Sequence, residues 1–166
     1  ELGDQTAAER TKRSRLDVIL DKLNHVYTEV LEAIEGGGLE QLDAAEKISW
    51  WREFETFRNR LPLIDHTLIA DAEASDLAKT YCCSTLTQFL IRTFQLSHGE
   101  AASRVRAAAA VGPRTSMLGE PLEPLLPKLA AVQRNCSITV ENVQIVERAM
   151  HKLSRAGLNP DDVETS

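Results

Sequence analysis

Residues 89–127 read FLIRTFQLSHGEAASRVRAAAAVGPRTSMLGEPLEPLLP, and this stretch decides the fold. Ser97 and Glu100 have the Ser-x-x-Glu form of a capping box, in which each side chain bonds the amide of the other residue. A helix is therefore predicted to start here. Only Gln95 and Leu96 separate this start from the end of an apolar helix. A connection this short is typical of a helix-turn-helix unit.

The predicted second helix carries two arginines, Arg104 and Arg106, among small residues. Ala107 and Ala110 are expected on the face of this helix that is free to approach a partner closely. Guanidinium groups beside small residues are able to reach phosphates or guanine edges, so this face predicts a nucleic-acid contact. The candidate contact residues are Arg92, Ser97, His98, Ser103, Arg104, Arg106 and Arg114.

Two residues argue against a DNA-reading unit. Ile91 lies where many helix-turn-helix units have a small residue, and Gln95 lies where a turn glycine is common. An Ala-rich helix is also suited to close packing inside a helical domain. Both interpretations of this helix, nucleic-acid contact and close packing, stay open from the sequence.

The segment after the Ala-rich helix, from Gly112 to Pro127, is punctuated by Gly and Pro. Repeated Pro and Gly exclude a continuous helix and predict an extended strap with turns. Its leucines are expected to hold the strap against the helical body.

Apolar residues recur at three- and four-residue steps in most of the remaining chain, which is the pattern of amphipathic helices. No run alternates apolar and polar residues between hairpin turns, so no strand is predicted. The predicted fold is all-α, a single multi-helix domain with a helix-turn-helix-like unit and a Gly/Pro-rich strap. The further helices are expected over residues 16–34, 39–60, 63–74, 75–81, 84–94, 128–134 and 139–157.

The predicted organisation has three parts. Residues 1–15 form a polar, basic lead-in, residues 16–158 form the helical domain, and residues 159–166 are interpreted as the start of a truncated following segment. The basic residues of the lead-in are better explained as a solvated segment than as a nucleic-acid-binding arm, because short basic runs are common.

Composition limits the class of protein. A chain of 166 residues with 43% hydrophobic residues is able to bury the core of one domain. The formal net charge of −6 means that any contact with DNA must come from a local basic patch. Three cysteines without metal-binding spacing favour a reducing, cytoplasmic setting. No apolar run approaches the roughly 20 residues of a membrane-spanning helix, so no membrane partner is expected.

The first predicted helix has an apolar stripe that runs from Leu16 to Ile34. The stripe resembles a coiled-coil seam but lasts less than three heptads. Packing against its own domain is therefore the preferred interpretation, and a homodimer through this helix is the alternative. The adjacent Trp50 and Trp51 are unable to face one core together, so one of them is expected to be partly exposed.

Nothing in the sequence predicts catalysis. His25, His66, His98 and His151 are scattered singly, and each is better explained as a surface or packed imidazole than as a ligand. His66 and Asp65 are neighbours in a predicted helix, where successive side chains diverge by about 100° and do not form a dyad. No catalytic residue, metal site, cofactor or small-molecule substrate is expected, and the chain is not predicted to be an enzyme.

The run LSHGEAASRVRAAAAVGPRTSMLGEPLEPLLPKLAAVQRN, followed by SITVENVQIVERAM, resembles the helical domain of unknown function of the actinobacterial 13E12-repeat family. The shared pattern includes Leu-Ser, Glu-Ala, Gly-Pro-Arg and Leu-x-Gly-Glu-Pro-Leu, and the resemblance covers about residues 16–155. In that family the domain commonly precedes an HNH endonuclease domain. The resemblance therefore implies a role in DNA transactions of mobile or repeated elements. This chain lacks the clustered residues of an HNH site.

Two functions follow as expectations. The first is a non-catalytic DNA-binding or target-positioning module of an HNH-nuclease-associated protein, which binds duplex DNA and is cytoplasmic and nucleoid-associated. The second is a protein-interaction or dimerisation module that has no direct contact with nucleic acid. Arginines Arg92, Arg104, Arg106 and Arg114 distinguish the two, because a joined positive patch favours the first and acid pairs favour the second.

Overall fold

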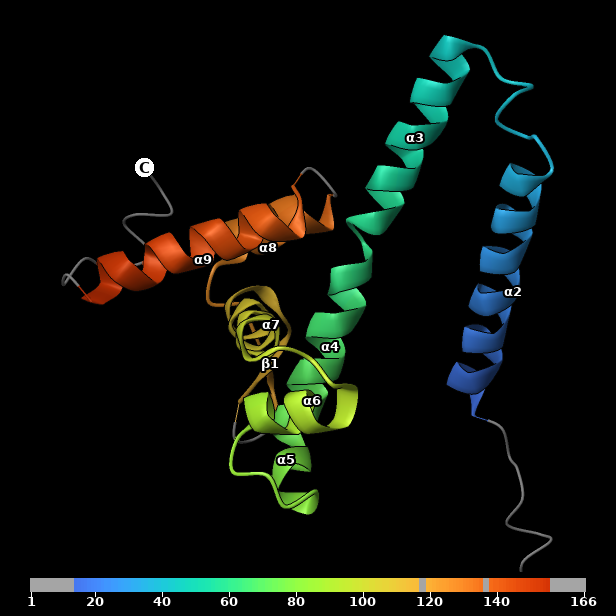
Figure 1. Cartoon of the computed structure of the whole chain (residues 1–166). Helices are drawn as coiled ribbons and strands as arrows, with labels where there is room; N and C mark the ends of the chain where they lie inside the picture. The colour runs from blue at the N-terminus through green and yellow to red at the C-terminus, as the bar shows by residue number, and fades with distance from the viewer. Residues whose placement is uncertain (1–13, 117–118, 136–137, 156–166) are drawn as a thin grey trace, which may run out of the picture. The chain divides into compact units, whose positions relative to one another are not determined.

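The computed structural model describes residues 14–116, 119–135 and 138–155 (Figure 1). Almost all of its regular structure is helical, which confirms the predicted all-α fold class. The chain divides into two compact units, residues 1–51 and 52–166. The single domain over residues 16–158 stays a prediction. Most of the lead-in and all of residues 159–166 lie outside the described residues.

The first unit contains helix α2 (Arg15–Glu35) and the first part of helix α3 (Ala44–Arg58). Helix α2 begins at a reciprocal capping box, in which the Ser14 hydroxyl accepts from the Asp17 amide and the Asp17 carboxylate accepts from the Ser14 amide. It ends at Gly36, whose amide donates to the Glu32 carbonyl at 2.8 Å. Both ends lie close to the predicted limits.

Helix α3 begins at Ala44, later than the predicted start at residue 39. The Asp43 carboxylate accepts from the Ala45 and Glu46 amides at 2.7 and 2.9 Å, and the Glu46 carboxylate accepts from the Asp43 amide at 2.8 Å. The cap at Asp43 fixes the start of the helix, and residues 39–41 form turns before it instead of a first helical turn.

The second unit is organised around helix α7 (His98–Val111). Helices α4 (Leu61–Ala74), α6 (Leu86–Phe94), α8 (Pro127–Arg134) and α9 (Val140–Arg155) all contact α7, and Figure 1 shows α7 nearly end-on among them. The short helix α5 (Leu77–Thr80) joins α4 to α6 and contacts both.

Local capping explains where the central helices begin. The Thr85 hydroxyl accepts from the Gln88 amide at the start of α6, and the Ser97 hydroxyl accepts from the Glu100 amide at the start of α7, both at 3.1 Å. Gln95 ends α6 with φ of 55°, the left-handed conformation that glycine adopts most readily. The two helices are therefore joined by a tight turn, as predicted.

The strap between α7 and α8 contains a short antiparallel pair of strands, β1 (Arg114–Thr115) and β2 (Pro121–Leu122). No strand was predicted, because a strand of two residues is too short to show alternation. Leu126 is buried, and its amide donates to the Ala110 carbonyl at 2.9 Å, which fixes the end of the strap to α7. Leu122 and Leu125 are exposed, so of these three leucines Leu126 alone fulfils the expected role.

Two apolar clusters pack on different sides of α7. One contains Ala101 and Ala108 of α7 with residues of α4 and α6, and the other contains Ala107, Ala110 and Val111 with residues of α8 and α9. The expectation that Ala107 and Ala110 face outward is wrong, since they are only 2% and 6% exposed. Small side chains let neighbouring helices approach α7 from both sides, so the Ala-rich helix is a packing element.

Candidate functional site

Arg104 lies between two carboxylates. Its Nη2 atom is 2.6 Å from Glu100 Oε1, one turn earlier on α7, and its Nη1 atom is 3.5 Å from Asp65 Oδ1 on α4. The side chain keeps 40% of its surface exposed. Glu100 therefore bonds Arg104, so only the hydroxyl half of the predicted Ser97–Glu100 capping box is present. Arg104 links α7 to α4.

Arg106 points to a different helix. Its Nε atom lies 3.4 Å from Glu147 Oε2 on α9, where the Glu147 side chain is only 12% exposed. Arg104 and Arg106 are two positions apart, and side chains at that spacing lie on different faces of a helix. The two arginines therefore do not form one joined surface, and each is neutralised by an acidic neighbour.

The other predicted contact residues occupy separate places. Arg92 is exposed on α6, with Nη1 3.9 Å from the sulfur of Cys83. Ser97 is the cap of α7, His98 is an exposed first residue of that helix, and Ser103 is half-buried. Arg92 and Arg104 thus have different partners, a cysteine sulfur for Arg92 and two carboxylates for Arg104.

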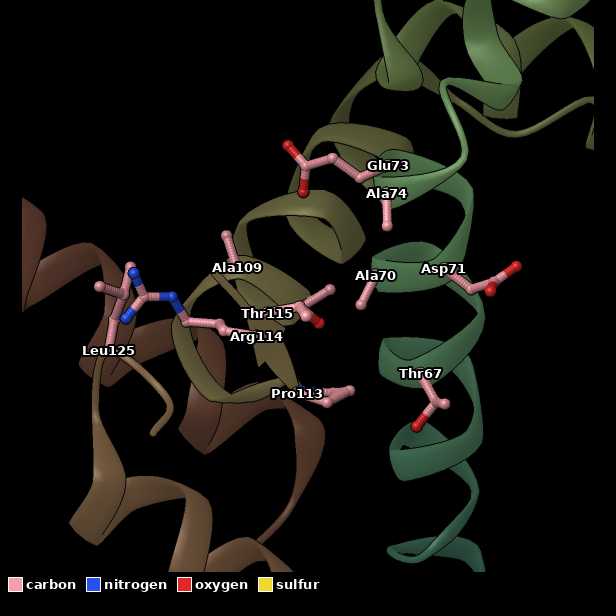
Figure 2. Close-up of a pocket in the computed structure, with 11 residues that line it drawn as sticks. Thr67, Ala70, Asp71, Glu73, Ala74, Ala109, Pro113, Arg114, Thr115 and Leu125 are labelled. Atoms are coloured by element: carbon pink, nitrogen blue, oxygen red, sulfur yellow. The ribbon is translucent and has the colours of Figure 1, made fainter. Parts of the chain in front are cut away.

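Arg114 lines a groove of about 460 Å³ between α4 and the end of α7. Figure 2 shows Ala70 and Ala74 of α4 facing the groove, while the Arg114 side chain extends toward Leu125. The Arg114 guanidinium donates to the Glu123 carbonyl at 3.2 Å. Asp71 and Glu73 also belong to the groove wall, so its charge is mixed.

The acidic partners of the two arginines were not predicted from the sequence. Glu100 and Arg104 have the i, i+4 spacing of a helical ion pair, which was a usable signal. Asp65 and Glu147 are 39 and 41 residues away from Arg104 and Arg106 in the sequence, so no local pattern points to them. Tertiary packing alone brings these groups together.

His66 is buried on α4 and is 3% exposed, which agrees with the expectation of a surface or packed imidazole. Its Nδ1 atom has no hydrogen-bond partner among the described residues. Burial lowers the pKa of His66 below its ordinary value of 6.5, because desolvation outweighs the opposing effect of the Asp65 carboxylate. His66 is therefore neutral at physiological pH, an uncharged polar group inside the helical unit.

The first unit has a different kind of surface. None of the residues of α2 is buried, although its apolar stripe includes Leu16, Leu20 and Tyr27, which are 72%, 58% and 64% exposed. A continuous apolar face of this kind is typical of an interaction site. In α3, Trp50 and Trp51 are both exposed, at 38% and 63%, which exceeds the expectation of one partly exposed tryptophan.

Metal-binding clusters and membrane-spanning helices are both absent from the described residues. No group of three or more His, Cys, Asp or Glu side chains in that part of the chain is placed to hold a metal ion. Among the same residues, no helix has both the length and the apolar character needed to cross a membrane.

The sequence of residues 49–161 matches the family described as Domain of unknown function (DUF222), and the chain belongs to this family. Uncharacterized protein Rv3466 of Mycobacterium tuberculosis is 34% identical over 146 residues, which are 86% of this chain and 59% of that protein. Uncharacterized protein Mb1614c of Mycobacterium bovis is 33% identical with the same coverage. Uncharacterized protein Rv1128c of M. tuberculosis is 30% identical over 74% of this chain and 27% of its own length.

The chain thus spans 59% or less of the length of these relatives. No solved structure matches it significantly. The part that the family covers includes all of α4 to α9, whereas α2 lies before the family match.

Proposed function

We propose that this chain is a non-catalytic helical interaction module that self-associates through the apolar face of α2. The observation that carries the proposal is that α2, a helix of 21 residues with a continuous apolar stripe, buries none of its side chains. Most of the stability of a helix in a protein comes from packing of its apolar face, so packing of the stripe against a partner stabilises α2.

The stripe is suited to a second copy of the same helix. Leu16, Ile19, Leu23, Val26 and Val30 follow the alternating three- and four-residue steps of a coiled-coil seam. Contact between two such faces buries both stripes at once. A symmetric interface of this type uses the same patch on both copies.

Charges beside the stripe favour an antiparallel arrangement. Arg15 and Lys22 flank the stripe in the N-terminal half of α2, and Glu29 flanks it in the C-terminal half, whereas Asp17, Asp21, Glu32 and Glu35 lie away from it. Antiparallel packing places the flanking basic residues of one copy near Glu29 of the other. The proposed occupant of the α2 face is therefore a second, antiparallel copy of this chain.

Sedimentation equilibrium over a wide concentration range tests this proposal. The chain is expected to form a dimer, and Leu23→Glu is expected to weaken dimerisation by more than about tenfold, because it places a charge in the seam. Thr28→Glu is the matched control, since Thr28 lies on the far side of α2 and is exposed. A strict monomer at the highest concentration, or equal effects of the two substitutions, contradicts the proposal.

A second candidate function is DNA binding or target positioning through α7. The observation that favours it is that Arg104 and Arg106 keep 40% and 45% of their side-chain surface exposed despite their acid pairs. The exposed Arg104–Glu100 pair contributes only about 0 to 1 kcal/mol, so a phosphate group is able to compete for the Arg104 guanidinium. The acidic partners and the separate directions of the arginines make this candidate weaker than self-association.

Fluorescence anisotropy with a labelled duplex tests the second candidate. If α7 contacts DNA, binding weakens steeply with salt, and Arg104→Ala with Arg106→Ala reduces both affinity and salt dependence. The double variant Arg58→Ala, Arg60→Ala is the control, because it removes the same two positive charges from a part of the chain outside α7. Absence of binding, or equal loss in both double variants, removes α7 as the contact.

We also propose that the chain belongs to the 13E12-repeat family, which is a finer assignment than the DUF222 family. The resemblance to the 13E12-repeat family is consistent with membership of the DUF222 family, and it supports placing this module beside an HNH endonuclease domain in a longer protein.

The exposed thiol of Cys82 and the buried thiol of Cys83 are unpaired, in keeping with a reducing cytoplasmic setting. Nucleoid association belongs only to the DNA-binding candidate.

A further inference from the structure

A pocket of about 330 Å³ lies in the second unit, between the first turns of α4, the first half of α7 and α9. It is separate from the groove in Figure 2, which lies along the second half of α4. One wall is apolar, formed by Leu61, Pro62 and Ala107, and the rest is polar. The pocket does not involve α2, so binding of a ligand there is independent of self-association.

The pocket contains a buried polar group without a partner among the described residues. His66 lines it, is only 3% exposed, and has no hydrogen-bond partner for Nδ1 in that part of the chain. Buried polar atoms in folded proteins are nearly always bonded to protein, water or ligand, because an unbonded one is destabilising. A ligand atom that forms a hydrogen bond with the His66 ring would supply the missing partner.

The lining of the pocket has a net negative charge. The lining has two carboxylates, Asp65 and Glu100, and one guanidinium, Arg104. Arg104 is held closely by Glu100 at 2.6 Å, whereas its distance to Asp65 is 3.5 Å. Arg104 is thus shared between two carboxylates, and two negative charges against one positive charge leave the lining with a net negative charge.

Three groups in the lining are able to accept hydrogen bonds. Asp65 supplies a carboxylate, Gln144 of α9 supplies an amide oxygen, and neutral His66 supplies a ring nitrogen lone pair. Burial lowers the pKa of His66, which keeps that lone pair free of a proton. An alkyl ammonium group has three N–H donors, one for each acceptor.

We propose that this pocket binds a primary ammonium group on an alkyl chain, with its N–H groups directed at Asp65, Gln144 and His66. The methylene groups of the chain pack on Leu61, Pro62 and Ala107. Binding includes a turn of the His66 ring about its Cβ–Cγ bond, which brings the enclosed Nδ1 to the cavity. The ligand is a lysine side chain of a partner protein or a free polyamine, since both have this group.

Calorimetry and NMR with three probes test the proposal. Spermidine and Nα-acetyl-lysine methylamide represent the two sources, and propyltrimethylammonium is a cation that has no N–H donors. The primary ammonium probes are expected to bind and to shift the Ala107 and Gln144 amide resonances. The quaternary probe is expected to bind at least about tenfold more weakly, because hydrogen bonds to charged groups account for that much affinity.

Asp65→Asn is expected to weaken spermidine or lysine binding by about tenfold or more. Asp71→Asn is the matched control, because it makes the same change on the same helix outside this pocket, and it is expected to change affinity less than about twofold. Gln144→Leu gives a second variant if Asp65→Asn alters the circular dichroism spectrum. Tighter binding of spermidine identifies a free polyamine as the source of the ammonium group. Tighter binding of Nα-acetyl-lysine methylamide identifies a lysine side chain of a partner protein.

Three results overturn the proposal. The first is no binding by either primary ammonium probe, and the second is equal binding by the quaternary probe. The third is an equal effect of Asp65→Asn and Asp71→Asn on affinity. That result would mean that the cationic probes are attracted by the net charge of −6 of the whole chain and not by the pocket.

Discussion

Helices α7 and α2 differ in a way that their sequences do not suggest. Helix α2 has a clear apolar stripe and buries no side chain, whereas α7 has mostly alanines and buries Ala101, Ala107, Ala108, Ala110 and Val111. Helices α4, α6, α8 and α9 pack on α7, which explains why small residues suit it. Burial is decided by the neighbours of a helix, and an apolar stripe shows only that a helix has a surface to bury.

The two helices have separate roles. Helix α7 holds the second unit together, and its arginines join it to α4 and α9. In the proposed function, helix α2 is the surface that binds a second copy. Substitutions in α7 should therefore affect folding, and substitutions in the stripe of α2 should affect association.

The largest effect is expected from Ala101→Asp, because Ala101 is fully buried between α7 and its neighbours. An unpaired carboxylate at this position should lower the free energy of unfolding by more than about 3 kcal/mol. Ala109→Asp is the control, since Ala109 is exposed on the same helix and should change stability by less than about 0.5 kcal/mol. Urea denaturation measures both, and similar losses would mean that α7 is not packed as described.

A smaller effect is expected at the end of α7. A Cβ atom added at Gly112 would clash with the Ala108 carbonyl oxygen, so Gly112→Ala should lower the free energy of unfolding by about 1 to 3 kcal/mol through displacement of the strap. Gly99, in the first turn of the same helix, has open space around it. Gly99→Ala should instead stabilise by up to about 1 kcal/mol, through helix propensity. Thermal unfolding that gave both variants the same sign would contradict these assignments.

The smallest effect concerns His66 and pH. Since burial lowers the pKa of His66 below 6.5 in the folded state, the unfolded chain takes up this proton more readily. The contribution of His66 to stability is therefore fully present above pH 6.5 and falls as the pH decreases toward the folded-state pKa. Urea titrations at several pH values should show this slope, and His66→Gln should lack it. An identical pH dependence in both proteins would show that His66 titrates normally.

Much of the fold was predictable because it is encoded locally. Ser97 caps its helix as its position in the sequence indicates, and Thr85 and Thr139 cap their helices in the same way. Gln95 takes the left-handed conformation at a position where a turn glycine is common. Capping and turn chemistry involve residues three or four positions apart, so a single sequence contains the necessary information.

The arrangement around α7 was not predictable in the same way. Alanines occupy most of this helix, so its pattern does not reveal which faces are buried, and the inner positions Ala107 and Ala110 were assigned to the outside. The pairs that engage Arg104 and Arg106 across helices join residues 39 and 41 positions apart. The pocket around His66 likewise draws on α4, α7 and α9, whose meeting depends on tertiary packing.

Hydrogen exchange of α2 and α7, measured in the same sample at a low and a high protein concentration, tests the central comparison most directly. Amides of α7 should be equally protected at both concentrations, because its partners belong to the same unit. Amides of α2 should exchange rapidly in dilute protein and become protected in concentrated protein, since its partner is a second copy. Protection of α2 that does not depend on concentration, whether high or low, would contradict the proposed self-association.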